Sequence, residues 1–106
     1  MNESEFSQCC DEIMLAIEEA IDNSGVDIDY ETSAGVLTLT IEENASKVIV
    51  SRQPALSQIW LAAKSGGYYF NYSDSDWICT ATQESLGELL QRVCKEQQAG
   101  DVTFDV

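Results

Sequence analysis

The sequence predicts an α+β fold, a two-layer sandwich in which two helices pack on one face of a five- to six-stranded antiparallel sheet. Apolar residues recur at spacings of three and four near both ends of the chain, which is typical of amphipathic helices. Between these ends, apolar and polar residues alternate in six short segments, which is typical of strands. Short connections join these segments and favour hairpins, hence an antiparallel sheet. The predicted order is helix, six strands, helix, within a single domain over residues 1–106.

The first helix is predicted over residues 3–22. Asn2, with Glu5 three residues later, resembles a capping box at its start. Gly25, in the segment NSG, is suited to end it. The apolar stripe of this helix consists of Phe6, Cys10, Ile13, Met14, Ile17 and Ile21. Its acidic residues lie on the opposite side and are therefore expected to face solvent.

Six strands are predicted next, over residues 26–31, 36–42, 47–52, 57–63, 68–72 and 77–80. The first strand carries an acid at every second position, so one of its faces is lined by carboxylates. In the fourth strand, Ile59 and Leu61 lie on one face, whereas Gln58 and Trp60 lie on the other. If Ile59 and Leu61 face the helices, Trp60 points outward. An exposed Trp is a candidate for partner contact, although single exposed apolar residues are also common.

The second helix is predicted over residues 83–98, with Thr82 as its N-cap. Its stripe consists of Leu86, Leu89, Leu90, Val93 and Cys94. The short segment after Gly100 is expected to pack as an extended tail.

Charge narrows the classes of function. The formal net charge is −14, and no basic residue precedes Lys47, whereas most of the nineteen acids do. Such a field repels nucleic acid and anionic membrane surfaces, and it attracts cations and basic proteins. No apolar run approaches the roughly 20 residues that span a membrane. Solubility alone is the simpler explanation of an acidic surface, but the uneven distribution of charge favours a functional one.

Histidine is absent, which excludes His-dependent catalytic arrangements and His-bearing zinc sites. The four cysteines contain no C-x-x-C pair. We expect Cys10, Cys79 and Cys94 to be small buried apolar residues. The N-terminal segment lacks the pattern of a secretory signal, so reduced thiols and a cytoplasmic location are expected. A metal ion would therefore meet mainly carboxylate oxygens.

The segment SRQPALSQIWLAAKSGGYYF, residues 51–70, resembles the frataxin family, and within it the bacterial branch. The segments DWIC (76–79), ESLGELL and the opening MNESEF fit the same family, so the resemblance covers essentially the whole chain. It implies a helix–sheet–helix sandwich that binds iron weakly on an exposed acidic ridge. It also implies contacts with cysteine desulfurase and the iron–sulfur scaffold protein, as a regulator, iron donor or sensor of cluster assembly.

Carried over residue by residue, the resemblance gives two sets of candidate site residues. The candidate metal ligands are Glu3, Asp11, Glu12, Glu18, Glu19, Asp22, Asp27, Asp29 and Glu31. The candidate partner-binding residues are Glu18, Glu19, Asp22, Trp60, Gln58 and Arg52. The loop at 23–25 is expected to bring the helix and strand acids side by side. Asn23 stands where relatives often carry another acid, so weaker or rearranged iron binding is expected at this ridge.

A ridge with one or two carboxylates per ion is open and unselective, so other divalent or trivalent cations should compete with Fe²⁺ and Fe³⁺. Metal and protein partner should also compete, because they share the same acids. We expect a monomer that associates when it is loaded with iron. Two alternatives remain: an iron oxidase or storage protein, and an acidic interaction module without a physiological metal. The enzyme is disfavoured because no catalytic or cofactor motif is present.

Overall fold

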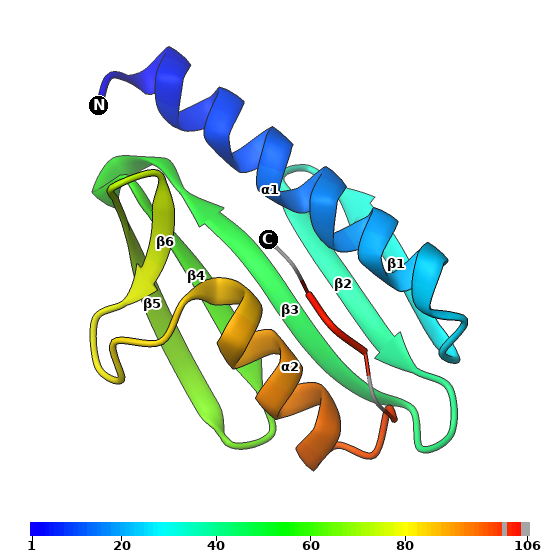
Figure 1. The fold of residues 1–106 in the computed structure, drawn as a ribbon. Helices are drawn as coiled ribbons and strands as arrows, with labels where there is room; N and C mark the ends of the chain where they lie inside the picture. Colours follow the sequence, from blue (N-terminus) through cyan, green and yellow to red (C-terminus); the bar gives the residue numbers. More distant parts are fainter. Residues whose placement is uncertain (101, 105–106) are drawn as a thin grey trace.

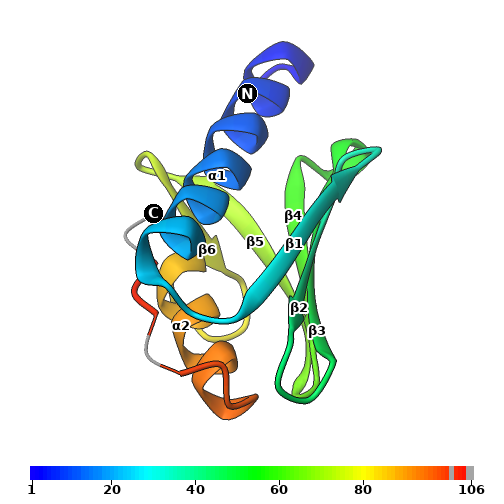
Figure 2. The same cartoon turned by 90° about the vertical axis from the view of Figure 1, so that its right-hand side faces the viewer.

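The computed structural model describes residues 1–100 and 102–104, and it confirms the predicted fold class (Figure 1). The elements in chain order are α1 (Glu3–Ser24), β1 (Ile28–Ser33), β2 (Val36–Ile41), β3 (Ser46–Gln53), the 3₁₀ turn η1 (Pro54–Leu56), β4 (Gln58–Ala63), β5 (Gly66–Ser73), β6 (Asp76–Cys79) and α2 (Leu86–Glu96). The six strands form one sheet in the order β1-β2-β3-β4-β5-β6, each antiparallel to its neighbour. Both helices cover the same face of this sheet (Figure 2).

The core lies between the helices and the inner face of the sheet. Helix α1 buries five residues of the predicted stripe, and α2 buries all five of its own. The N-terminal end of α1 packs against the last strand, where the rings of Phe6 and Trp77 meet edge to face with centroids 5.9 Å apart. After α2, the segment at residues 102–104 runs between the two helices (Figure 1). Val102 and Phe104 are buried there, so the packed tail is confirmed for these residues, while 101 and 105–106 lie outside the described structure.

Helix α1 begins and ends where the sequence predicts, within two residues. The Asn2 side chain accepts a hydrogen bond from the Glu5 amide at 2.8 Å, and Gly25 ends the helix in the left-handed conformation with φ of 72°. Helix α2, in contrast, begins later than predicted. Ser85, not Thr82, is the N-cap, and it forms a full capping box with Glu88. The chain cannot be helical at residue 83, because Gln83 has a φ of +64°.

Strand β1 begins at Ile28 and not at Val26, and it extends to Ser33. Only Ala34 and Gly35 remain to turn the chain into β2, and both have positive φ, 52° and 80°. Two consecutive positive φ angles are what a two-residue hairpin needs to match the twist of its strands. Asp27 consequently lies just before β1 and not within it.

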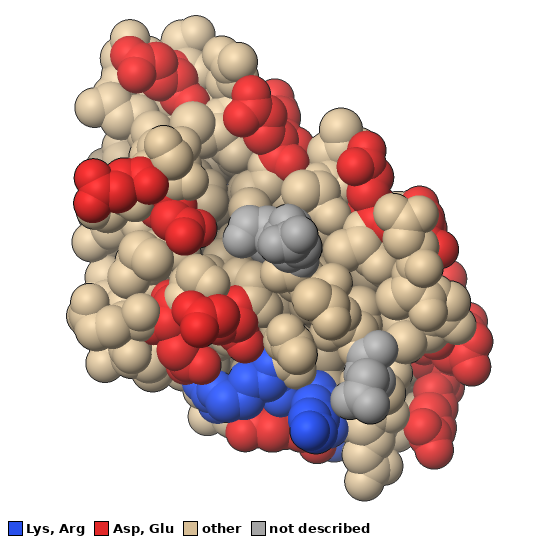
Figure 3. Space-filling view, viewed as in Figure 1, with Lys and Arg blue, Asp and Glu red and all other residues tan. Residues whose placement is uncertain are grey.

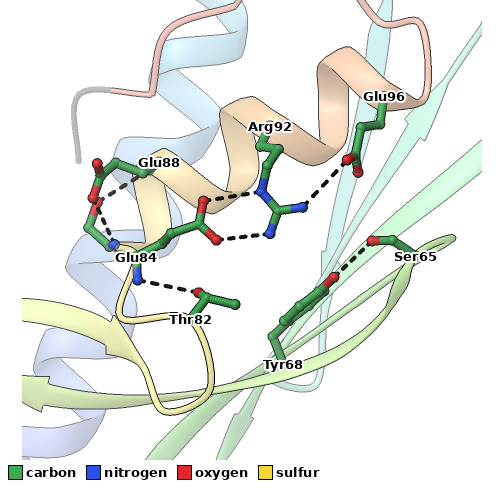
Figure 4. Close-up of polar contacts among 8 residues, drawn as sticks. Ser65, Tyr68, Thr82, Glu84, Glu88, Arg92 and Glu96 are labelled. Atoms are coloured by element: carbon green, nitrogen blue, oxygen red, sulfur yellow. Dashed lines mark hydrogen bonds and ion pairs between the residues drawn. The ribbon is translucent and has the colours of Figure 1, made fainter.

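Two polar clusters hold α2 in place. Arg92 donates to both carboxylate oxygens of Glu84, at 2.9 and 3.1 Å, and also contacts Glu96 (Figure 4). At the other end, the buried side chain of Gln97 bonds to the backbone N–H of Lys64 and to the Ser46 hydroxyl. The first cluster ties α2 to the loop before it, and the second ties its C-terminal end to β3 and the β4–β5 turn.

All four cysteines are free thiols. The three that were expected to be apolar core residues are buried, which confirms that prediction, while Cys9 is half-buried. Burial raises the pKa of the Cys10 and Cys94 thiols to about 11. In the described part of the chain, neither helix is long and apolar enough to cross a membrane.

Candidate functional site

The acids of α1 form an exposed row, because the helix turns its apolar stripe toward the sheet. Side chains of Asp and Glu appear along α1 and at the β1 edge of the sheet, whereas Lys and Arg gather near the C-terminal end of α2 (Figure 3). Glu18 is half-buried and the other acids of this row are exposed. The acids of α1 that were predicted as metal ligands are Glu3, Asp11, Glu12, Glu18, Glu19 and Asp22. The structure therefore exposes this set along α1, with Asp11 and Glu18 on the flank next to Thr32 and Glu12 on the flank next to Trp77.

Strand β1 holds two of these carboxylates through hydroxyl groups. The Tyr30 hydroxyl donates to both oxygens of Asp22, at 2.8 and 3.0 Å. The Thr32 hydroxyl donates to Glu18 at 2.6 Å. The hydrogen bond to Asp22 raises the pKa of Tyr30 above its usual value, because it stabilises the protonated phenol. These bonds orient the two carboxylates without cancelling their charge.

The strand acids lie on the other face of β1, which corrects the expectation that the two sets lie side by side. Tyr30 and Thr32 point to the helix layer, so Asp29 and Glu31 point to the outer face of the sheet. There they line an open hollow of about 320 Å³, together with Thr38, Thr40 and Lys47. The acids thus occupy two surfaces that meet at the β1 edge.

No three Cys, Asp or Glu side chains of the described residues converge so that they could hold a metal ion. A cation at this surface would bind one or two carboxylates and complete its shell with water. Carboxylate oxygens are suitable donors for Fe²⁺, Fe³⁺ and other hard cations. An exposed site with few ligands holds its ion weakly and exchanges it readily. The donor set therefore fits transient binding of iron as a cargo.

Arg52 lies on the inner face of the sheet, away from Trp60. It was grouped with Trp60 as a partner-binding residue, but it pairs with Ile59 across β3 and β4 and faces the helices. Its Nη2 atom donates to Asp11 Oδ1 at 2.7 Å. The alternation of residues in β3 could have predicted this inward direction, since Arg52 lies on the same face as Val50, which is buried. The ion pair with Asp11 itself was not predicted.

Trp60 lies on the outer face of the sheet, so its predicted direction is confirmed, while its role in partner binding stays a prediction. Its indole lies over Gly67, where a Cβ atom would come within 3.0 Å of the indole nitrogen. Tyr69 is its cross-strand neighbour on β5. Gln58 also lies on this face, where its amide nitrogen donates to Asn71 at 2.8 Å. Trp60 and Gln58 therefore share a surface from which Arg52 is excluded.

Comparison with known proteins gives consistent matches. The sequence model of a family described as a frataxin-like domain matches residues 1–100. An iron–sulfur cluster assembly protein CyaY from Ectopseudomonas mendocina (strain ymp) is 44% identical over 107 residues, covering 99% of this chain and 96% of that protein. The structure of frataxin from Psychromonas ingrahamii matches with a TM-score of 0.93 at 36% identity, covering 100% of both chains.

A more distant match is the trimeric frataxin of the yeast Saccharomyces cerevisiae, solved in complex with ferrous iron. Its TM-score is 0.67 at 26% identity, covering 91% of this chain and 85% of that chain. The similarity therefore includes both helices and the entire sheet.

Proposed function

Because the chain belongs to the frataxin family, we propose that it binds iron weakly on its acidic surface and regulates iron–sulfur cluster assembly through contacts with cysteine desulfurase and the scaffold protein. The observation that carries the proposal is the row of exposed carboxylates on α1. In the described part of the chain, Asp11 is the one acid of this row that forms an ion pair. The remaining negative charge is available to cations and to basic protein surfaces.

Iron binding is supported by the chemistry of the side chains and by a relative. The carboxylates of Glu18 and Asp22 are already oriented by hydroxyl groups, and Glu19 lies on the same helix, exposed to solvent. The yeast frataxin with a related fold was solved with ferrous iron. The proposal assigns Glu18, Glu19 and Asp22 to iron and desulfurase alike, with Asp29 and Glu31 as a second, separate cation surface.

Contact with the scaffold protein is assigned to the outer sheet face around Trp60. Trp is enriched at the centres of protein interfaces, because its large apolar ring retains a polar N–H group. The indole is supported by Gly67 and flanked by Tyr69, whose side chain is exposed. The uneven charge would orient this protein as it approaches a partner, because the basic residues near the C-terminal end of α2 lie away from the acidic row on α1 (Figure 3). The location proposed is the cytoplasm, where the four free thiols would stay reduced.

A metal titration tests the iron part of the proposal. Fe²⁺ under anaerobic conditions, or Mn²⁺ as a substitute, should raise the melting temperature of the protein, because bound cations relieve repulsion among the acids. The effect should be lost in the triple variant Glu18→Gln, Glu19→Gln, Asp22→Asn. A control should keep it while neutralising as many exposed acids elsewhere: Glu42→Gln, Glu43→Gln, Asp74→Asn. Equal stabilisation of both variants would contradict the assignment.

An NMR shift map tests the partner assignment. Desulfurase should perturb the exposed acids of α1, the scaffold protein should perturb the Trp60 face, and added metal should displace desulfurase. Loss of desulfurase binding with rising salt would support charge steering, since the attraction between exposed charges is screened over a distance of about 10 Å at 0.1 M salt. The enzyme alternative makes a different prediction, namely faster oxidation of Fe²⁺ with the protein than without it. Perturbations confined to other surfaces would refute the proposal.

A further inference from the structure

Arg52 has a distinct place in the charge pattern of this protein. Among the described residues, it is the one basic side chain that forms an ion pair with an acid of α1. The pair joins two elements that are far apart in sequence, the C-terminal end of β3 and the middle of α1. The Arg52 side chain is 20% exposed, whereas that of Asp11 is 69% exposed. The cation is thus sheltered, while the carboxylate that it binds stays open to solvent.

The fold holds this side chain along a defined path. Its stem crosses Gly35 at the β1–β2 turn, where a Cβ atom would come within 3.2 Å of both Cγ and Cδ. The Nη2 atom reaches Asp11 at 2.7 Å and the sulfur of Met14 at 3.5 Å. The buried Nε atom has no hydrogen-bond partner among the described residues. The guanidinium is therefore held mainly by its stem packing and by Asp11.

The same guanidinium lines a hollow of about 170 Å³ between α1 and the sheet. Asp11, Glu18 and Thr32 line it as well. Without Arg52, this hollow would offer a cation two carboxylates and a hydroxyl group along one side of the helix. With Arg52 in place, a metal ion at Asp11 must approach a fixed positive charge that already holds Oδ1, and the repulsion between the two cations weakens metal binding there.

We propose that Arg52 is an internal competitor for cations, which occupies Asp11 and confines iron to the Glu19 and Asp22 end of α1. This inference rests on the proposed function, because it concerns the distribution of metal along the same acidic row. Arg52 and a metal ion repel each other at Asp11, so each weakens the binding of the other there by the same factor. Arg52 thereby determines which part of the surface iron occupies.

The test is residue-resolved NMR of the full chain with Mn²⁺, whose paramagnetism broadens signals near the bound ion. In Arg52→Gln, broadening at Asp11 should appear at an about fivefold lower metal concentration than in the wild type, the factor that corresponds to a well-formed ion pair. The double variant Arg52→Gln, Asp11→Asn should lose this gain. Arg92→Gln is the matched control, because it removes the same charge and an ion pair remote from α1. Equal gains in Arg52→Gln and Arg92→Gln would overturn the inference and leave the proposed function intact.

The wild type provides a second test that needs no substitution. As Mn²⁺ is added, signals of Glu19 and Asp22 should broaden before those of Asp11. Broadening at Asp11 at the same or a lower concentration overturns the inference. Absence of broadening along the whole of α1 in the wild type would instead refute the proposed metal binding. The two failures are therefore distinguishable in one titration series.

Discussion

Removal of the Gln97 side chain should destabilise the protein more than any other substitution of a polar residue on α2 or next to it. Gln97 follows the last turn of α2, and its side chain is nearly inaccessible, with 4% of the residue exposed. Its Oε1 accepts from the Lys64 amide at 3.0 Å. Its Nε2 donates to the Ser46 hydroxyl at 2.9 Å and to the Lys47 carbonyl at 3.4 Å. One side chain thus joins α2 to two separate parts of the sheet.

The size of the effect follows from the groups that Gln97→Ala leaves behind. A buried polar group that loses its partner costs about 1–3 kcal/mol. The Ser46 hydroxyl is buried and bears this cost, whereas the Lys64 amide lies at an exposed turn where water can replace the lost acceptor. We therefore expect a loss of about 2–3 kcal/mol in the free energy of unfolding. For a domain of this length, that loss corresponds to a decrease of about 10–20 °C in melting temperature.

Urea unfolding followed by circular dichroism measures this loss directly. The slope of the transition should not change, since the surface exposed on unfolding is the same in both proteins. Gln91→Ala is the matched control, because Gln91 is an exposed glutamine on α2 and the substitution creates no cavity. The reasoning fails if Gln97→Ala lies within about 0.5 kcal/mol of this control, which is the usual range of exposed substitutions.

Three further outcomes are expected. Arg92→Gln should lower the free energy of unfolding by about 0.5–1 kcal/mol at pH 7. Arg92 lowers the pKa of Glu84, so this stability is present above the unfolded-state pKa and should disappear in urea titrations as the pH falls through the folded-state pKa. Gly67→Ala should displace the indole of Trp60 by a few tenths of an ångström, and acrylamide should then quench the Trp fluorescence more strongly than in the wild type. A thiol reagent at pH 8 should modify Cys9 in the native protein well before the three buried thiols, and four equally fast thiols would contradict the described packing. The buried thiols are those of Cys10, Cys79 and Cys94.

Periodicity predicted most of the fold because each element has one buried face. Helix α1 and all six strands lie within two residues of their predicted bounds, since burial of alternate or every third to fourth residue leaves a direct trace in the sequence. The start of α2 was misplaced because Thr82 and Ser85 are both good N-cap residues. The choice between them depends on the positive φ of Gln83, which no apolar pattern records.

The candidate site was predicted in its composition and less well in its geometry. Alternation puts Asp29 and Glu31 on the face opposite Ile28 and Tyr30, so their direction away from Glu18 could have been inferred from the sequence once the helices were expected on the apolar face. The pairing of Arg52 with Asp11 depends on a tertiary contact between elements distant in sequence. Gln97 could not be recognised either, because a glutamine at the end of a helix is usually exposed, and its burial depends on partners in β3 and the β4–β5 turn.

The edge-to-face contact between Phe6 and Trp77 has a consequence for the order in which the protein is made. Translation delivers α1 first, at about 5–20 residues per second, yet Trp77, the ring that meets Phe6, is made only after the first five strands. The sheet has no such delay, because each strand pairs with the strand made just before it. The nascent chain can therefore form its hairpins one after another before α1 packs against them. Until then, repulsion among the acids of α1 keeps the helix from aggregating with other chains. Closure of α1 over β6 is then among the last steps of folding.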